Sequence, residues 1–235
     1  MWEVELAGDS FDLDELVLSM NKTEPSICKT PHGYILRSEY FNQMNTPAEV
    51  EESATEILSV LNGICVVLLS TRKSISIAAI AKVFPGQPRQ TYISVQDGFH
   101  AKGTFSMVVT NSDGTVVTTY QADPAVAWLK LASDNPQVAK VFRLLNDPHL
   151  NWGPMYKIFE IILDDMQGFK PISDLGWASQ SAMKRFKHTA NSPTAAGDLA
   201  RHGVEPTSPP AAPMAMSEAK SLIDTLVHNW LRTKA

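Results

Sequence analysis

The first sixty residues contain short segments whose apolar residues follow first a strand period and then a helix period. Residues 2–6 alternate between apolar and polar side chains, which predicts a strand. After Gly8-Asp9-Ser10, residues 11–20 carry apolar side chains at helical spacing. Residues 26–29 and 34–37 flank Thr30-Pro31-His32-Gly33, the pattern of a β-hairpin.

A second helix is expected to begin at Thr46-Pro47-Ala48-Glu49. This motif combines a threonine cap, proline at the first helical position and glutamate at the third. Apolar residues at helical spacing follow as far as Leu61, and Asn62-Gly63 predicts the end of the helix.

Beyond residue 64 the pattern is typical of strands, rich in β-branched side chains and separated by turn sequences. The connections are too short for parallel crossovers, so we expect an antiparallel meander. The predicted strands are 75–83, 91–95, 103–110 and 115–120.

Everything after Asp123-Pro124 favours helix. Each predicted segment has an apolar stripe, and X-Pro pairs separate several of them. We therefore expect an α+β protein, with an α+β module at 1–122 and a helical bundle at 123–235. A proline-rich loop or lid is expected at 192–213, a length that is often functional or disordered. The predicted helices are 124–133, 136–146, 152–167, 173–190 and 216–233.

Composition and charge narrow the class of protein. An apolar fraction of 44% and a charged fraction of 19% are those of an ordinary globular protein. We find no apolar run of about 18 residues, no export signal and no disulfide framework, and we expect a cytoplasmic location without membrane contact. Residues 1–60 hold 12 acidic and 3 basic side chains, whereas residues 176–235 hold 4 and 7. Contact with a polyanion is therefore expected only near the C-terminal end.

The common catalytic motifs are missing from the sequence. It contains no Cys-x-x-Cys, His-Glu-x-x-His, Gly-x-Ser-x-Gly or phosphate-binding glycine loop. We accordingly expect neither a metal nor a cofactor.

One basic segment concentrates polar chemistry. On a helix, Lys184, His188 and Asn191 share a face, while Met183, Phe186 and Ala190 point to another. Cations beside an imidazole and an amide could hold a phosphate and move a proton. The alternative is a solvated basic helix face with a packed arginine and histidine. The candidate catalytic residues are Arg185, His188, Arg201 and His202, and the candidate substrate-binding residues are Lys184, Lys187 and Asn191.

The last 85 residues resemble a divergent HEPN domain, a helical-bundle family of prokaryotic ribonucleases and nucleotide binders. The segment beginning Trp152-Gly-Pro-Met-Tyr-Lys resembles the family's long aromatic-rich helix. The stretch from Arg185 to Gly203 resembles its basic segment, and the stretch from Met216 to Leu231 resembles its final helix. The resemblance covers about a third of the chain.

The family's nuclease site is an arginine separated by four to six residues from a histidine. Here His188 follows Arg185 too closely, and His202 follows it too late. Either Arg185 meets His202 across an inserted loop, or the chain is a non-catalytic member. In a ribonuclease, His188 or His202 would take the 2′-hydroxyl proton, with arginines stabilising the phosphorane.

The resemblance implies an RNA- or nucleotide-directed protein, a homodimer formed through the helical half and a role in bacterial stress or phage defence. A metal-independent ribonuclease and a binding protein both remain open. The alternative function is a non-enzymatic interaction protein that docks a protein partner through its acidic N-terminal module.

Overall fold

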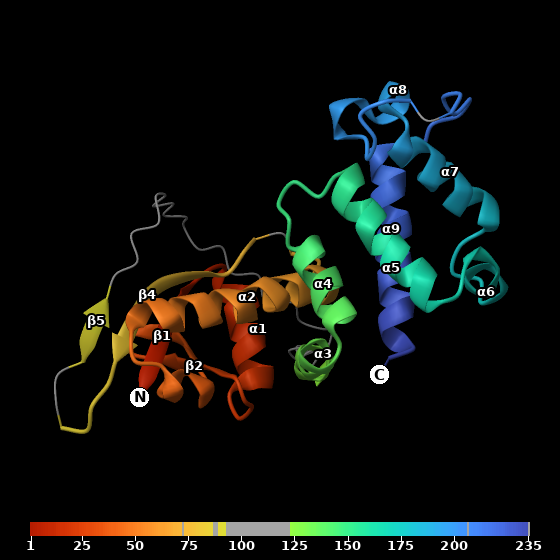
Figure 1. Cartoon of the computed structure of the whole chain (residues 1–235). Coiled ribbons are helices and arrows are strands. Elements are labelled where there is room, and N and C mark those ends of the chain that lie inside the picture. Colours follow the sequence, from red (N-terminus) through yellow and green to blue (C-terminus); the bar gives the residue numbers. More distant parts are fainter. Residues whose placement is uncertain (72, 87–88, 93–122, 206, 235) are drawn as a thin grey trace, which may run out of the picture. The chain divides into compact units, whose positions relative to one another are not determined.

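The computed structural model describes residues 1–71, 73–86, 89–92, 123–205 and 207–234 (Figure 1). They form two compact units, Met1–Lys130 and Leu131–Ala235. The expected α+β class is confirmed, because the first unit carries an antiparallel sheet and the described part of the second is helical. The strands expected at 103–110 and 115–120 and the boundary expected near 122 lie outside the described residues.

The sheet of the first unit has the order β2-β3-β1-β4-β5, and every pairing is antiparallel. The strand expected at 2–6 and the hairpin expected around Thr30–Gly33 are both confirmed. The strands are β1 (Trp2–Ala7), β2 (Ser26–Thr30), β3 (Gly33–Arg37), β4 (Ser76–Lys82) and β5 (Gln90–Tyr92).

One face of the sheet packs against two helices, α1 (Ser10–Met20) and α2 (Pro47–Leu69). Trp2, Val4 and Leu6 alternate along β1 and enter a common core with apolar residues of both helices. A short 3₁₀ helix, η1 (Tyr40–Gln43), adds Phe41 to this core. The layers are therefore sheet and helix, as amphipathic strands and helices require.

The other face of β1 carries two glutamates, and arginines neutralise both. Arg37 and Arg89 pair with Glu3, and Arg89 also pairs with Glu5. The Glu3 side chain is only 7% exposed, and a buried carboxylate is tolerated only when it is paired. These two glutamates therefore contribute to the fold instead of to an acidic outer surface.

The expected start of α2 is confirmed, but its expected end is wrong. The Thr46 hydroxyl accepts a hydrogen bond from the Glu49 amide (3.3 Å), and the Glu49 carboxylate accepts one from the Asn45 amide (2.9 Å). The helix then continues through Asn62-Gly63 to Leu69. It ends where Ser70 adopts the left-handed conformation, at φ 51°.

Asn62 lies inside the helix, and its side chain binds a distant stretch of the backbone. Its amide nitrogen donates to the Ile75 carbonyl (2.9 Å), and its amide oxygen accepts from the Ile75 amide (2.8 Å). The buried Asn62 side chain thus pairs with both backbone groups of Ile75, just before β4, in the way that the backbone of a neighbouring strand would.

The length of α2 raises the question of whether this helix could cross a membrane. Among the described residues, α2 is the one helix whose length and apolar composition would allow it to cross a membrane. Half of its most apolar window is buried inside the protein, and core helices commonly share these properties. Its length and composition are therefore weak evidence for a membrane span.

The second unit is a helical assembly, and α3 runs across the division between the units. The helix expected at 173–190 is wrong. Two helices lie there, separated by a turn in which Gly176 has φ 73° and Ser179 caps the second helix. The helices are α3 (Asp123–Asp134), α4 (Pro136–Leu145), α5 (Trp152–Asp165), α6 (Phe169–Asp174), α7 (Gln180–Asn191), α8 (Pro193–Ala196) and α9 (Met216–Arg232).

Helix α5 is the centre of this unit and contacts α4, α7 and α9. In Figure 1, α5 crosses in front of α9, and the two helices are in contact. Phe186 of α7 packs against three aromatic rings of α5, those of Trp152, Tyr156 and Phe159, with centroids 5.1 to 6.4 Å apart. This aromatic cluster fixes α7 and therefore the position of the basic segment.

Candidate functional site

Helix α7 presents its basic side chains because its other face is buried in the aromatic core. Met183, Phe186 and Ala190 have no exposed surface, as the sequence predicted. Lys184 and Lys187 lie on the exposed surface, and no ion pair joins either to a carboxylate of the described chain. The helix also contains no acidic residue. It is therefore a locally basic edge in a chain whose net charge is −5.

Residues 192–213, here called the strap, leave the end of α7 and return to the start of α9. The strap contains α8 and the 3₁₀ helix η2 (Gly197–Leu199). Figure 1 shows it beside the ends of α7 and α9. The expected loop thus contains two short helices, and all four candidate catalytic residues contact it (Arg185 and His188) or belong to it (Arg201 and His202).

Arg185 holds the end of the strap with its whole guanidinium group. Its Nε donates to the Ala212 carbonyl (2.9 Å), and one terminal nitrogen donates to the Pro213 carbonyl (3.0 Å). The other terminal nitrogen pairs with Glu218 (2.6 Å) at the start of α9. In this arrangement Arg185 has structural partners at each of its nitrogens.

His188 contacts a different part of the strap. Its Nε2 lies 2.8 Å from the Ser208 carbonyl oxygen, which can only accept, so Nε2 carries the proton. The Thr207 hydroxyl lies 3.5 Å from the same nitrogen. Nδ1 is the ring nitrogen that remains to accept a proton.

Arg201 and Asn191 meet at a tyrosine of α5. The Arg201 guanidinium lies 4.4 Å from the centroid of the Tyr156 ring and pairs with Glu160 (3.2 Å). The Asn191 amide nitrogen donates to the Lys187 carbonyl (2.8 Å) and lies 3.4 Å from the Tyr156 hydroxyl. Arg201 also donates its backbone amide to the Ala190 carbonyl (2.8 Å).

The structure brings some of the predicted site residues together and not others. Arg201 and Asn191 share Tyr156, whereas Arg185 and His188 bind separate stretches of the strap. His202 is exposed. Within the described chain, no hydrogen bond or ion pair joins any two of the four candidate catalytic side chains. A proton relay among them is therefore not assembled in this conformation.

The sequence did not single out Glu205, which closes the strap on itself. Its carboxylate accepts from the Ser192 hydroxyl (2.9 Å) and from the Thr194 amide (3.0 Å). Partial desolvation raises the pKa of Glu205, but these hydrogen bonds and the nearby His188 outweigh it and hold the pKa below its ordinary value. Ser192-Pro193 indicates the start of α8, because serine followed by proline is a common helix start, but it does not point to Glu205, 13 residues further along the chain.

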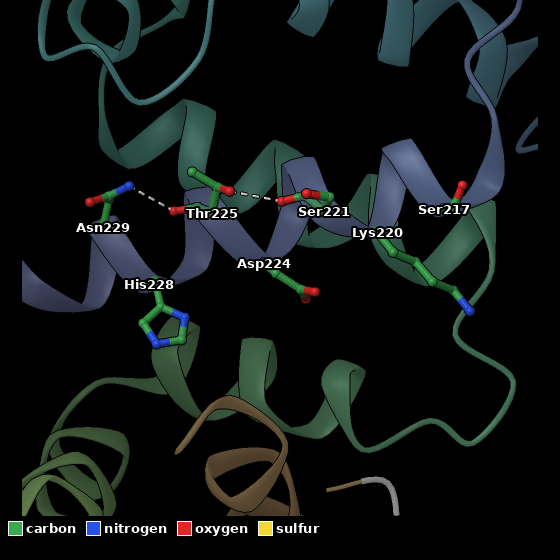
Figure 2. Close-up of a pocket in the computed structure, with 7 residues that line it drawn as sticks. All are labelled: Ser217, Lys220, Ser221, Asp224, Thr225, His228 and Asn229. Atoms are coloured by element: carbon green, nitrogen blue, oxygen red, sulfur yellow. Dashed lines mark hydrogen bonds between the residues drawn. The ribbon is translucent and has the colours of Figure 1, made fainter. Parts of the chain in front are cut away.

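A second polar surface follows α9, where a shallow hollow is lined by side chains of this one helix (Figure 2). Two rows at four-residue spacing lie along it, one of small polar residues and one of charged residues and histidine. Thr225 donates to the Ser221 carbonyl (2.8 Å) and Asn229 to the Thr225 carbonyl (2.9 Å), so these groups bond their own helix. The lining residues are Ser217, Lys220, Ser221, Asp224, Thr225, His228 and Asn229.

Neither the Cys65 thiol nor a group of metal-binding side chains offers a second candidate site in the described chain. Burial, and to a smaller extent the charge of Asp12, raise the pKa of the Cys65 thiol to about 12, so it stays protonated at neutral pH. Among the described residues, no three side chains of His, Cys, Asp or Glu are placed to hold a metal ion.

The basic edge of α7 and the strap that covers its end therefore form the best-defined candidate site. Comparisons of the chain with protein families, with curated proteins and with solved structures find no match.

Proposed function

We propose that the helical unit binds RNA or a related polyanion at the basic edge of α7, as a HEPN-like protein of the binding type. The observation that carries this proposal is the pair Lys184 and Lys187, exposed and without a carboxylate partner among the described residues. Phosphate contacts of this kind supply most of the affinity for nucleic acid. The resemblance to HEPN domains favours RNA as the polyanion.

Binding is a better account than cleavage because the two arginines already have partners. A phosphorane is stabilised by donors aimed at the developing charge. Arg185 directs its donors at two carbonyls and Glu218, and Arg201 pairs with Glu160 over Tyr156. Catalysis would require both arginines to leave these partners.

The resemblance to HEPN domains also implies a homodimer, a bacterial cytoplasmic location and a role in defence, and we include these in the proposal. Two copies pair through their helical units, and the protein acts in the bacterial cytoplasm in stress response or phage defence. Sedimentation velocity of the purified full chain measures the first of these directly. A monomer at all concentrations up to about 100 µM would remove the dimer from the proposal.

The test compares two pairs of cations at the same helical spacing. Lys184→Ala/Lys187→Ala removes the pair on α7, and Lys140→Ala/Arg143→Ala removes an exposed pair on α4. We expect the α7 variant to bind a labelled single-stranded RNA about tenfold more weakly than the wild type in 50 mM salt. The slope of log affinity against log salt should fall by about 1.4, or about 0.7 per lost cation.

The α4 variant should retain most of the affinity. Equal losses in both variants would indicate unspecific attraction, and no saturable binding by the wild type would remove the proposal. The same samples, incubated in EDTA and resolved by size, report cleavage. Metal-free cleavage that is lost in His202→Ala would make the protein a ribonuclease.

One observation favours the second candidate function, docking of a protein partner through the first unit. Phe11 and Leu18 lie seven residues apart on the outer face of α1 and are 59% and 49% exposed. Asp14 is exposed on the same helix. If RNA binding fails, a partner retained from native extract by the wild type, and lost with Phe11→Ser/Leu18→Ser, would support docking instead. Retention by both proteins would remove α1 as the docking face.

A further inference from the structure

The strap differs from the rest of the helical unit in what holds it. Between residues 193 and 213, no described apolar side chain is buried, and Leu199 and Val204 are 52% and 80% exposed. Burial of apolar surface is the main term that keeps a segment folded. The strap therefore depends on its polar contacts.

Those polar contacts are individually weak. The ion pair of Arg201 with Glu160 is 40% and 45% exposed, and the Arg185 side chain, which donates to the last two strap carbonyls, is 39% exposed. Exposed pairs contribute little and are screened by salt. The other contacts to the body of the unit are hydrogen bonds. Arg185 donates two of them to the Ala212 and Pro213 carbonyls at the end of the strap, and single bonds join His188 to Ser208 and Arg201 to Ala190.

The closed strap also leaves two acceptors without a donor. Asn191 Oδ1 and Glu205 Oε1 are both buried, and neither accepts a hydrogen bond in the described chain. The Asn191 amide cannot simply be turned over, since its nitrogen donates to the Lys187 carbonyl. A buried acceptor without a partner disfavours the state that buries it, because water would satisfy that acceptor once it is exposed.

We propose that the strap is a latch that opens as a unit while the rest of the helical unit stays folded. Opening withdraws Arg201 from Tyr156 and Glu160 and returns the orphan acceptors of Asn191 and Glu205 to water. It uncovers the outer face of the Tyr156 ring and the Asn191 amide. Locally opening segments are those with few buried apolar contacts and exposed polar ones, which describes the strap.

Trypsin gives a direct measure of opening in the full-length protein. Trypsin can cleave after Arg201 only when the Arg201 side chain leaves the Tyr156 ring and enters the specificity pocket of the protease. Products that end at Arg201 or begin at His202, followed by mass spectrometry, report this one bond. We expect cleavage there under conditions in which circular dichroism shows the native helix content.

Glu160→Gln removes the ion pair while keeping the size of the side chain, and it should speed this cleavage about two- to fivefold. Raising NaCl from 50 mM to 1 M should have a similar effect on the wild type, after correction with a short arginine peptide. The control is Asp174→Asn, which breaks the exposed pair with Lys170 in α6, away from the strap. It should leave the rate unchanged.

Hydrogen exchange provides a second reading that does not require a variant. The Arg201 amide, which donates to Ala190, should exchange at least about 100-fold faster than the core amides of α5, and faster still in high salt. Equal exchange in the strap and in α5 would overturn the proposal. Cleavage after Arg201 that appears only as the helix content is lost, or that is insensitive to Glu160→Gln and salt, would overturn it too.

Discussion

Each unit contains a segment that follows a long helix and is held by polar side chains, but the two are held differently. In the first unit the segment after α2 reaches β4, and Asn62 binds both backbone groups of Ile75. In the second, the strap after α7 reaches α9 through contacts from Arg185 and His188. The first set of contacts is buried, whereas the second lies at the surface.

The difference lies in what accompanies each polar contact. Ile75 is 3% exposed and belongs to the apolar core of its unit, so its hydrogen bonds form where water is excluded. No comparable apolar anchor exists among the described strap residues after Ser192, and two buried acceptors, one on the strap and one at the end of α7, lack donors. Polar contacts close a segment firmly when apolar burial accompanies them and every buried polar group has a partner.

Among the variants that test the comparison between these two segments, we expect the largest effect on stability from substitution of Asn62. Asn62→Ala removes both bonds to Ile75 and leaves a buried amide and a buried carbonyl without partners. We expect a loss of about 2–4 kcal/mol in the free energy of unfolding, because each orphan group costs about 1–3 kcal/mol. Urea denaturation followed by circular dichroism measures it.

Asn229→Ala is the matched control, since its amide donates to a carbonyl of its own helix and is partly exposed. It should cost at most about 0.5 kcal/mol. Similar losses in the two variants would show that the contact between Asn62 and Ile75 has no special weight.

Local signals in the sequence were reliable where neighbouring residues decide the structure. Thr46-Pro47-Ala48-Glu49 predicted the start of α2 because capping uses groups within four residues. The buried face of α7 was predicted from Met183, Phe186 and Ala190 because helical spacing places them on one side. The hairpin of β2 and β3 was found for the same reason.

Signals failed where a distant partner decides. Asn62-Gly63 was interpreted as a helix end, yet Asn62 serves Ile75, thirteen residues further along the chain. For Arg185, a candidate catalytic residue, nothing in the sequence indicated that it would donate to carbonyls 27 and 28 residues away. A charged side chain near a long loop has the same sequence pattern whether it binds a ligand or holds that loop.

The smallest effects on stability are expected at Asp12 and Asp14 of α1, whose pKa values the fold shifts in opposite directions. Burial raises the pKa of Asp12 and exceeds the effect of the hydrogen bond from Thr71. Burial also acts on Asp14, but the hydrogen bonds from Lys29 and Tyr34 and the charge of Lys29 outweigh it and lower its pKa. Ionised Asp12 therefore costs stability at neutral pH, and ionised Asp14 contributes to it.

The sign of the pH dependence follows for each residue. The cost at Asp12 is present above its raised folded pKa and disappears below the unfolded value of about 3.9, so Asp12→Asn should stabilise by up to about 1 kcal/mol at pH 7 and not near pH 3. The contribution of Asp14 is present above about pH 3.9 and is lost as the pH falls through its lowered folded pKa. Asp14 is half exposed, so Asp14→Asn should cost at most about 0.5 kcal/mol at pH 7. Urea midpoints at both pH values measure the two effects. A loss of stability at pH 7 in Asp12→Asn would contradict the prediction, because it would mean that the negative charge of Asp12 stabilises α1 by more than its burial costs.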